Sequence, residues 1–367
     1  MKMRIQVGVV FGGMSAEHEV SWKSARNVLQ AMDPDKYDAM PLFIDKQGRW
    51  YALDYSEMQT QEVPAVISAE RRIFLAPGDE KGCIIGYREG TRRKNIDILF
   101  PVVHGPYGED GSLQGLCRLY QIPFVGASVL ASAVGMDKDV MKRLLREGGI
   151  PVPRFKVCFI EDRQTISHVS ICRELGLPLF VKPANLGSSV GISKVKSLEQ
   201  LPLAMDAAWE YDRKLLVEEC VEGREIECSV LGNWDPIASV PGEIVPRHDF
   251  YSYSAKYLDE EGASLRIPAP LPEGIIRNVQ EMAIQTFKAL CCEGMARVDF
   301  FLRDDGQLLV NELNSIPGFT NISMYPKLWE ASGIPNKELI DRLIQLALER
   351  FGVEKRLSRN YQGSSLV

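Results

Sequence analysis

A pair of β-prone runs around a tight turn constrains the fold of this chain more than any other feature. The stretch "ARVDFFLRDDGQLLVNELN" has the turn sequence Asp-Asp-Gly-Gln at its centre, and such a turn between alternating runs predicts a β-hairpin. If Arg303 pairs with Leu308, then Asp299 lies directly opposite Glu312. Two facing carboxylates destabilise a sheet unless they are exposed or share a cation.

The neighbours of this acidic pair favour a shared cation. In the same register Arg297 faces Asn314 on the same side of the hairpin, and Phe301 and Val310 continue that face. Asp, Glu and Asn provide the oxygen ligands that suit Mg²⁺, which in proteins usually also contacts substrate phosphates. The alternative is a solvated acidic face partly neutralised by Arg297. A register slip of one residue would remove the argument.

A second feature is the stretch "LFVKPANLGSSVGISKV", where a lysine stands at the mouth of a Gly/Ser loop between two apolar runs. Lys182 precedes the glycines and a strand follows them, which excludes a Walker A loop. The pattern predicts a strand-loop-strand flap for an anion. Gly187 and Gly191 would allow a close backbone approach, and Ser188 and Ser189 would add hydroxyl donors. The alternative is an ordinary hairpin with a surface lysine.

A flap for phosphates and a seat for a divalent metal, on separate parts of the chain, predict a nucleotide held between two lobes. The first third of the chain alternates strand and helix, with strands at "RIQVGVVFGG", "YDAMPLFID" and "NIDILFPVVHG" and a helix capped by Ser15. This alternation is typical of an open parallel α/β sheet. Residues 46–95 are less regular and are interpreted as an insertion.

The later part of the chain predicts two α+β lobes. Helices are expected at "DKDVMKRLLRE", at 165–175, at 197–210, at "PEGIIRNVQEMAIQTFKAL" and at "NKELIDRLIQLALERF", with strands near Phe155, Phe180 and Ile192. We therefore expect an N-terminal Rossmann-like domain at 1–131, a central lobe at 132–216, a C-terminal lobe at 217–358 and a tail at 359–367.

Composition excludes several classes of protein. The net charge of −6 gives no general basic surface for nucleic acid, and no apolar run reaches the roughly 20 residues of a membrane helix. The N-terminal run ends in Gly-Gly without a signal-peptidase site. None of the 8 cysteines forms a C-x-x-C pair, and the 4 histidines are scattered, so a zinc site is not expected. These features indicate a cytoplasmic protein.

Eight segments in order resemble the ATP-grasp superfamily, and within it the D-alanine–D-alanine ligases. They are "GGMSAEHEVS", "VVHGPYGEDGSLQG", "GMDKDVMKRLL", "FVKPANLGSSVGISKV", "VEECVEGREIECSVLG", "YSYSAKYLDEEG", "ARVDFFL" and "VNELNSIPGFTNISMYP". The resemblance implies an ATP-grasp fold, in which an N-terminal α/β domain precedes two lobes that clamp ATP. It also implies Mg²⁺, two ions per site with Mn²⁺ as a substitute, and a homodimer.

The resemblance further implies which residues bind the nucleotide and the metal. Lys138 and Lys182 would hold phosphates, and Lys256 would reach phosphate or a substrate carboxylate. The adenine hinge would begin at Glu218 and read the base through the backbone of Glu219, Cys220 and Val221, while Glu225 would bind the ribose. Asp299, Glu312 and Asn314 match the metal ligands.

A second set of residues is implied for the amino-acid substrates. Glu17 would receive the ammonium group of the first D-alanine, with His104, Ser188 and Tyr257 beside it. The Arg297 side chain and the Gly318 backbone would stabilise an oxyanion. Ser323 and Met324 would contact the second D-alanine. Simpler interpretations are a helix-dipole contact for Glu17, a buried hydrogen-bonded His104, an N-cap for Ser323 and core packing for Tyr257.

The resemblance implies ligation of two D-alanine molecules through an acyl phosphate, for peptidoglycan precursor synthesis. A ligase that joins D-alanine to D-lactate or D-serine is the closest alternative, although a tyrosine at Tyr257 favours D-alanine. Two other classes are weaker. A dinucleotide-binding dehydrogenase would need G-x-G-x-x-G after the first strand, which is absent, and a non-catalytic two-lobe binding protein would have no use for the facing carboxylates.

Overall fold

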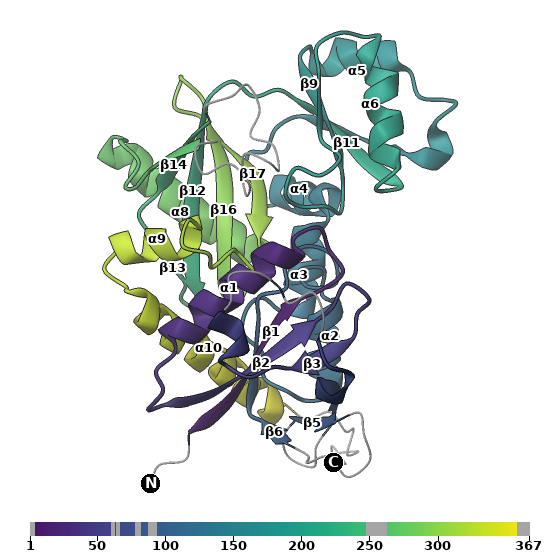
Figure 1. The fold of residues 1–367 in the computed structure, drawn as a ribbon. Helices are drawn as coiled ribbons and strands as arrows, with labels where there is room; N and C mark the ends of the chain where they lie inside the picture. The colour runs from purple at the N-terminus through teal and green to yellow at the C-terminus, as the bar shows by residue number, and fades with distance from the viewer. Residues whose placement is uncertain are drawn as a thin grey trace, which may run out of the picture.

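The computed structural model describes residues 4–59, 63, 67–77, 82–86, 94–246 and 263–357. Lys256 and Tyr257 lie outside these residues, as does the predicted tail. Three sheets make up the described part of the chain, each covered by helices (Figure 1). None of the helices within these ranges is long and apolar enough to cross a membrane.

The first sheet belongs to the N-terminal domain and has the strand order β6-β5-β4-β3-β2-β1-β7. Strand β1 pairs in parallel with β2 and β7, as the alternation of strand and helix predicted. The described part of the segment 46–95 adds β3 to β6 to the same sheet as antiparallel strands. The elements are β1 (Ile5–Gly12), α1 (His18–Ala31), β2 (Tyr37–Ile44), β3 (Trp50–Ala52), β4 (Arg72–Ala76), β5 (Gly82–Gly86), β6 (Lys94–Ile96), β7 (Ile98–Pro101) and α2 (Ser112–Leu119).

The turn from β1 into α1 differs from the prediction. Helix α1 begins at His18 and Glu17 stands at its N-cap position, so the expected cap by Ser15 is wrong. Instead, Ser15 Oγ donates to His104 O at 2.7 Å. Gly12 has a φ of +89°, and a Cβ there would lie 2.1 Å from Ile44 O, so only glycine fits. This tight turn carries the chain from the end of β1 towards Glu17 and α1.

The second sheet forms a small lobe, seen at the upper right of Figure 1. Its strands are antiparallel in the order β10-β9-β11-β8. Leu179, Val181, Leu201 and Val217 are among the buried residues that join the sheet to its helices. Every strand and helix predicted between 155 and 210 is confirmed: β8 (Phe155–Phe159), α5 (His168–Leu175), β9 (Leu179–Pro183), β10 (Ser193–Val195) and α6 (Gln200–Trp209), with β11 (Lys214–Glu219) completing the sheet.

The third sheet follows the order β15-β14-β12-β16-β17, with β13 paired to β12, and is antiparallel. Helices α3, α4 and α8 share its core, where Met141 and Leu145 pack with Phe287 and Val298. The elements are α3 (Val129–Met136), α4 (Lys138–Glu147), β12 (Arg224–Gly232), β13 (Ile237–Ala238), β14 (Gly242–Pro246), β15 (Ala263–Arg266), α8 (Glu273–Ala289), β16 (Gly294–Leu302) and β17 (Leu308–Asn314).

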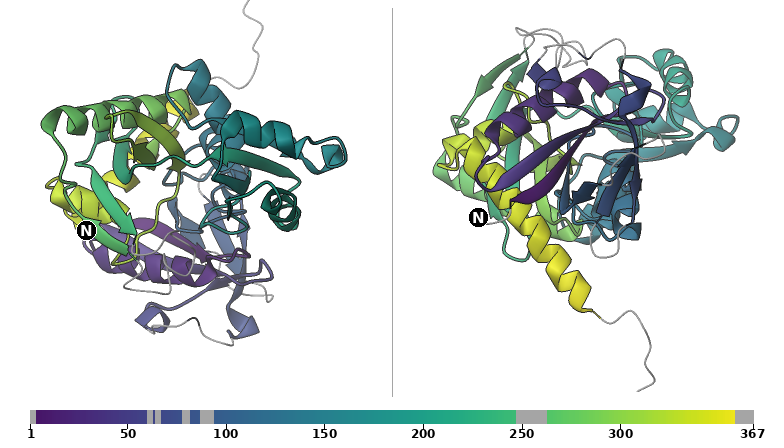
Figure 2. Two further views of the ribbon diagram at one scale, coloured as in Figure 1. Left: turned by 90° about the horizontal axis from the view of Figure 1, so that it is seen from above. Right: turned by 60° about the horizontal axis from the view of Figure 1, so that its bottom comes forward.

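The last two helices connect the third sheet back to the N-terminal domain. They are α9 (Met324–Ala331) and α10 (Asn336–Arg356), the latter five residues longer than the predicted run that ends at Phe351. Tyr325, Trp329 and Leu343 lie in one core with Val9 of β1. The right-hand view of Figure 2 shows α10 lying along the N-terminal domain.

The hairpin of β16 and β17 has the predicted acidic pair but not the predicted register at its turn. Asp299 faces Glu312 and Arg297 faces Asn314, as expected. Near the turn, however, Leu302 rather than Arg303 pairs with Leu308, because a β-bulge follows Asp299. The bulge inserts Asn311 as an extra residue in β17. The expectation that Val310 and Phe301 share a face is therefore wrong.

Candidate functional site

The flap between β9 and β10 and the acidic end of β17 line one cavity. The cavity encloses about 980 Å³ of space, part of which is open solvent. Of the three predicted metal ligands, Glu312 lines this cavity together with the flap, whereas Asp299 and Asn314 are not among its lining residues. The lining residues are Lys138, Phe180, Lys182, Leu186, Gly187, Ser188, Ser189, Ile192, Lys194, Glu218, Glu219, Cys220, Val221, Glu225, Phe301, Asn311 and Glu312.

Lys182 lies beside a buried carboxylate at the base of this cavity. Its Nζ donates to Glu218 Oε1 at 2.5 Å, and Lys142 Nζ stands 2.9 Å from Glu218 Oε2. Burial alone would raise the pKa of Glu218, but the two lysines outweigh it and lower that pKa to about 2. Burial also lowers the pKa of Lys142. Lys182, which lines the cavity, is therefore the lysine of this cluster that is placed to bind phosphate. Sequence reasoning missed Lys142, although its spacing of four from Lys138 places both lysines on one face of α4.

Lys138 reaches the flap from the first turn of α4. Its Nζ donates to Leu186 O at 2.5 Å and lies 3.9 Å from Glu312 Oε2. In the flap itself, Ser188 and Ser189 have φ values of +53° and +61°, a conformation that non-glycine residues rarely adopt. Both residues belong to a turn, and successive backbone N–H groups in a turn can form a concavity that binds an anion.

The predicted adenine hinge follows β11. The N–H groups of Glu219 and Cys220 donate to Arg154 O and Pro178 O, and the Glu219 carboxylate accepts from Arg154 Nε at 2.7 Å. Within the described hinge, these bonds leave the Val221 N–H as the candidate donor to a base. Glu225, predicted for the ribose, lies on the wall of the same cavity.

The flap also reaches the N-terminal domain. Ser188 Oγ donates a hydrogen bond to Glu17 Oε1, and Glu17 is buried at the N-terminus of α1. A buried carboxylate next to the phosphate loop is well placed for an ammonium group. Glu109, which sequence reasoning missed, accepts from the Gly105 N–H at 2.8 Å. Burial and the charge of Glu17 raise the pKa of Glu109 well above its ordinary value.

His104 is held by both ring nitrogens. Its Nδ1 lies 3.1 Å from Ile316 O, so Nδ1 carries the proton, and Nε2 lies 3.0 Å from Ser24 Oγ and accepts from it. Burial lowers the pKa of His104, which keeps the ring neutral. The side chain thus connects α1 with the loop after β17, beside Glu17. Its predicted contact with substrate stays a prediction.

This arrangement predicts a pH dependence of stability. The native pKa of His104 is below its unfolded value of about 6.5, so the unfolded chain binds the proton first and the free energy of unfolding falls as pH drops below that value. In the unaltered protein, His104 should lower the free energy of unfolding by up to about 1.4 kcal/mol for each pH unit below that value. We expect His104→Gln to lack this contribution. Urea unfolding of both proteins between pH 8 and 5.5 measures the difference. Parallel curves would show that His104 does not contribute.

Arg297 stands between two carboxylates on neighbouring strands. Its Nε and Nη2 donate to Asp299 at 2.7 Å each, and Nε lies 2.8 Å from Glu227 Oε2. Burial would lower the pKa of Arg297, but Asp299 and Glu227 raise it well above its ordinary value. Asn314 Nδ2 donates to Asp299 Oδ2 at 3.0 Å. Glu227 was not predicted, although strand alternation from Glu225 places both side chains on one face.

The loop after β17 positions the residues predicted for the second substrate. Ser323 stands at the N-cap position of α9, but its Oγ accepts from the Thr320 N–H at 2.9 Å rather than capping the helix. A Cβ on Gly318 would lie 2.7 Å from Ser323 Oγ, so the Gly318 backbone is close to that hydroxyl. Met324 is buried against Ile244 and Leu328. The roles of these residues stay predictions.

Comparison with known proteins gives consistent matches over almost the whole chain. Residues 6–127 match the family model described as D-ala D-ala ligase N-terminus, and residues 144–345 match that described as D-ala D-ala ligase C-terminus. A D-alanine–D-alanine ligase from Oceanobacillus iheyensis is 54% identical over 95% of this chain and 96% of its own.

Solved structures agree in fold. The D-alanine-D-alanine ligase from Coxiella burnetii is 41% identical, with a TM-score of 0.86 and 96% coverage of both chains. The VanG D-Ala:D-Ser ligase from Enterococcus faecalis is 33% identical, with a TM-score of 0.83, and covers 94% of this chain and 100% of its own. These structures confirm the predicted ATP-grasp ligase fold. The chain therefore belongs to the D-alanine–D-alanine ligase family.

Proposed function

We propose that this protein uses ATP to join two D-alanine molecules into D-alanyl-D-alanine, a component of peptidoglycan precursors. The observation that carries the proposal is the shared cavity, in which Lys182 and the flap face Glu312 of the acidic hairpin. The hydrogen bond from Ser188 to Glu17 adds a carboxylate for an amino acid at the end of the phosphate loop. Nucleotide and amino acid would thus meet at one place.

The donor set of the hairpin fits a divalent metal ion. Within the described residues, no group of three or more His, Cys, Asp and Glu side chains is arranged as metal ligands. Asp299, Glu312 and the Asn314 amide oxygen would hold a metal together with phosphate oxygens, a donor combination typical of Mg²⁺, once Asp299 gives up hydrogen bonds from Arg297 and Asn314. When bound, Mg²⁺ would neutralise charge on the phosphates. A second ion, and Mn²⁺ as a substitute, stay predictions from the family resemblance.

The first step brings two anions together. The carboxylate oxygen of the first D-alanine attacks the γ-phosphorus of ATP, the bond to the β–γ bridging oxygen breaks, and ADP leaves. Lys138 and Lys182 would reduce the repulsion by binding phosphate oxygens, while Glu17 holds the ammonium group of the same D-alanine.

The second step forms the peptide bond. The amine of the second D-alanine attacks the acyl carbon, the carbon–oxygen bond to phosphate breaks, and the amine loses a proton. Arg297 would stabilise the oxyanion of the tetrahedral intermediate together with the Gly318 N–H, and Ser323 would bind the carboxylate of the second D-alanine. Lys256 and Tyr257 lie outside the described residues, and their roles stay predictions.

The cellular setting and assembly are part of the proposal. ATP and precursor amino acids are cytoplasmic substrates, which supports a cytoplasmic location. No nucleic-acid partner is proposed. The homodimer and the domain boundaries at 131, 216 and 358 stay predictions.

Mass spectrometry of the products tests the proposed activity. The protein is incubated with ATP, Mg²⁺ and an equimolar mixture of D-alanine, D-serine and D-lactate. We expect D-alanyl-D-alanine as the main product, with one ADP for each dipeptide. A main product that contains D-serine or D-lactate would establish the alternative ligase, and ATP hydrolysis without any condensed product would reject the proposal.

A further inference from the structure

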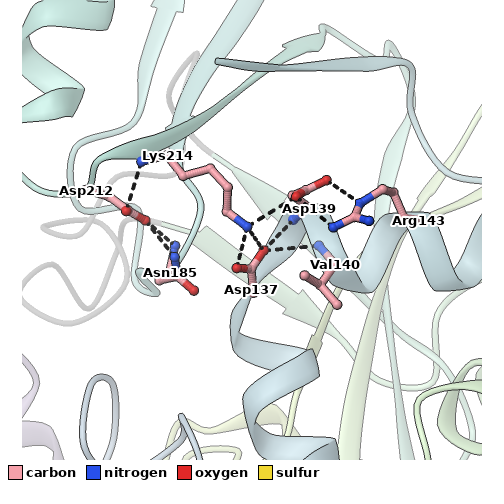
Figure 3. Close-up of polar contacts among 7 residues, drawn as sticks. All are labelled: Asp137, Asp139, Val140, Arg143, Asn185, Asp212 and Lys214. Atoms are coloured by element: carbon pink, nitrogen blue, oxygen red, sulfur yellow. Dashed lines mark hydrogen bonds and ion pairs between the residues drawn. The ribbon is translucent and has the colours of Figure 1, made fainter. Parts of the chain in front are cut away.

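A largely buried ion-pair junction lies where the small lobe meets the N-terminus of α4 (Figure 3). Lys214, on β11, donates to Asp137 Oδ1 at 2.7 Å and to Oδ2 at 2.5 Å, and to Asp139 Oδ2 at 3.2 Å. The exposed fractions of the three side chains are 13%, 17% and 6%. Asp137 and Asp139 flank Lys138, so the lysine predicted to bind phosphate stands between the two anchored carboxylates.

Backbone hydrogen bonds join the same two segments, the start of α4 and β11, through Ala184. The Lys138 N–H donates to Ala184 O at 3.0 Å, and the Ala184 N–H donates to Lys214 O at 2.9 Å. Ala184 follows β9, which carries Lys182. The main chain of Lys138 is therefore held relative to Lys182 by Lys214 from two sides, once through its backbone and once through its ammonium group.

The first residue of the flap is attached to the junction as well. Asn185 N and Nδ2 donate to Asp212 Oδ2 at 2.8 and 2.9 Å, and Lys214 N donates to Asp212 Oδ1 at 3.1 Å. Figure 3 shows Asp212 and Asn185 on one side of Lys214 and the acidic pair of α4 on the other. The start of the flap and the start of α4 thus share one anchor.

We propose that Lys214 is a positioning residue for nucleotide phosphate binding, because its bridge to Asp137 and Asp139 sets the position of Lys138 relative to Lys182 and the flap. The inference rests on the proposed function for its nucleotide. Lys214 does not line the cavity, so it acts through Lys138 rather than on phosphate.

The charges of the junction support a bridge that persists at neutral pH. Burial opposes ionisation of Asp139, but hydrogen bonds from Arg143 and Lys214 outweigh it and lower the pKa of Asp139. Removing one partner of a buried pair leaves the other charge uncompensated. Without Lys214, Asp137 and Asp139 would repel each other, and we expect this repulsion to displace the first turn of α4. A misplacement of about 1 Å far from the chemistry can cost an enzyme about 100-fold in rate, so we expect the position of Lys138 to matter for the phosphates.

Two ligands separate this role from a general structural one. ADP uses the phosphate lysines, whereas adenosine uses only the hinge. We expect Lys214→Met to weaken ADP binding about tenfold at constant Mg²⁺, and to leave the dissociation constant of adenosine within about twofold of the unaltered protein. Lys214→Arg restores the ion pairs and should recover most of the ADP affinity. Calorimetric titration measures these five dissociation constants.

The chain offers a matched control on the same helix. Arg143 forms an ion pair with Asp139 at 2.8 Å but does not reach the small lobe, so Arg143→Met should leave ADP binding unchanged. Asp137→Asn serves as the second variant if Lys214→Met does not fold. Asn retains the N-cap bonds that Asp137 accepts from Asp139 N and Val140 N, yet removes one charge of the bridge, and should also weaken ADP binding.

The outcomes are distinguishable. Selective loss of ADP affinity in Lys214→Met or Asp137→Asn, absent in Arg143→Met, supports the inference. Equal weakening of ADP and adenosine, or unchanged ADP binding in both variants, overturns it while the proposed function stands. If the unaltered protein binds neither ligand, the proposed function fails and the inference fails with it.

Discussion

Replacing Arg297 with alanine is expected to reduce kcat by about 10²- to 10³-fold while leaving ATP binding largely intact. The size follows from the loss of one buried donor to a developing oxyanion. Arg297 lies at the acidic hairpin, whereas the adenine hinge and Lys182 lie on the small lobe. Steady-state dipeptide formation gives kcat, and titration with ADP gives the nucleotide affinity.

Stability must be separated from catalysis in this variant. Arg297 lies between Asp299 and Glu227, which are directly paired across two strands. Its removal leaves two facing carboxylates, which costs about 3–5 kcal/mol of folding free energy. The double variant Arg297→Ala with Glu227→Gln removes one of those charges and should regain stability without regaining turnover. Normal turnover in either folded variant would reject the oxyanion role.

The second large effect is expected from Asp299→Asn combined with Glu312→Gln. Each change keeps the side chain's shape and removes a carboxylate that Mg²⁺ prefers as a ligand. ADP affinity should then lose its dependence on Mg²⁺, and dipeptide formation should fall at least about 10³-fold. Titration with ADP at several Mg²⁺ concentrations measures this directly.

The same hairpin provides the control for that experiment. Asp304 and Asp305 belong to its exposed turn, so Asp304→Asn with Asp305→Asn makes the same change in net charge outside the cavity. This control should retain Mg²⁺-dependent ADP binding. Retention of that dependence in the Asp299 and Glu312 variant would exclude the hairpin as the metal site.

Much of this architecture could be predicted from the sequence because local patterns carry it. The alternation of strand and helix after β1, the strand-loop-strand flap and the opposed pair of Asp299 and Glu312 all follow from spacing and turn chemistry. The face of the hairpin that carries Asp299, Glu312 and Asn314, however, was predicted from an incorrect register at the turn. The bulge at Asn311 restores the acidic pairing, and nothing in the local pattern of β17 marks that extra residue.

The remaining features depend on contacts between distant segments. Lys142 and Glu218 become partners only when α4 packs beside β11, and Glu227 meets Arg297 only when β12 pairs with β16. The start of α1 at His18 without a cap from Ser15 has the same origin, because the Ser15 hydroxyl donates to His104 O in the loop after β7. Single-sequence patterns do not encode such tertiary choices.

Oxygen transfer from substrate to phosphate tests most directly whether ATP and the D-alanine carboxylate react with each other in the shared cavity. D-alanine labelled with ¹⁸O in its carboxylate is supplied with ATP and Mg²⁺, and the released phosphate is analysed by mass spectrometry. The acyl-phosphate route predicts one ¹⁸O atom in each phosphate formed with dipeptide. Phosphate without the label, released at the rate of dipeptide formation, would contradict it.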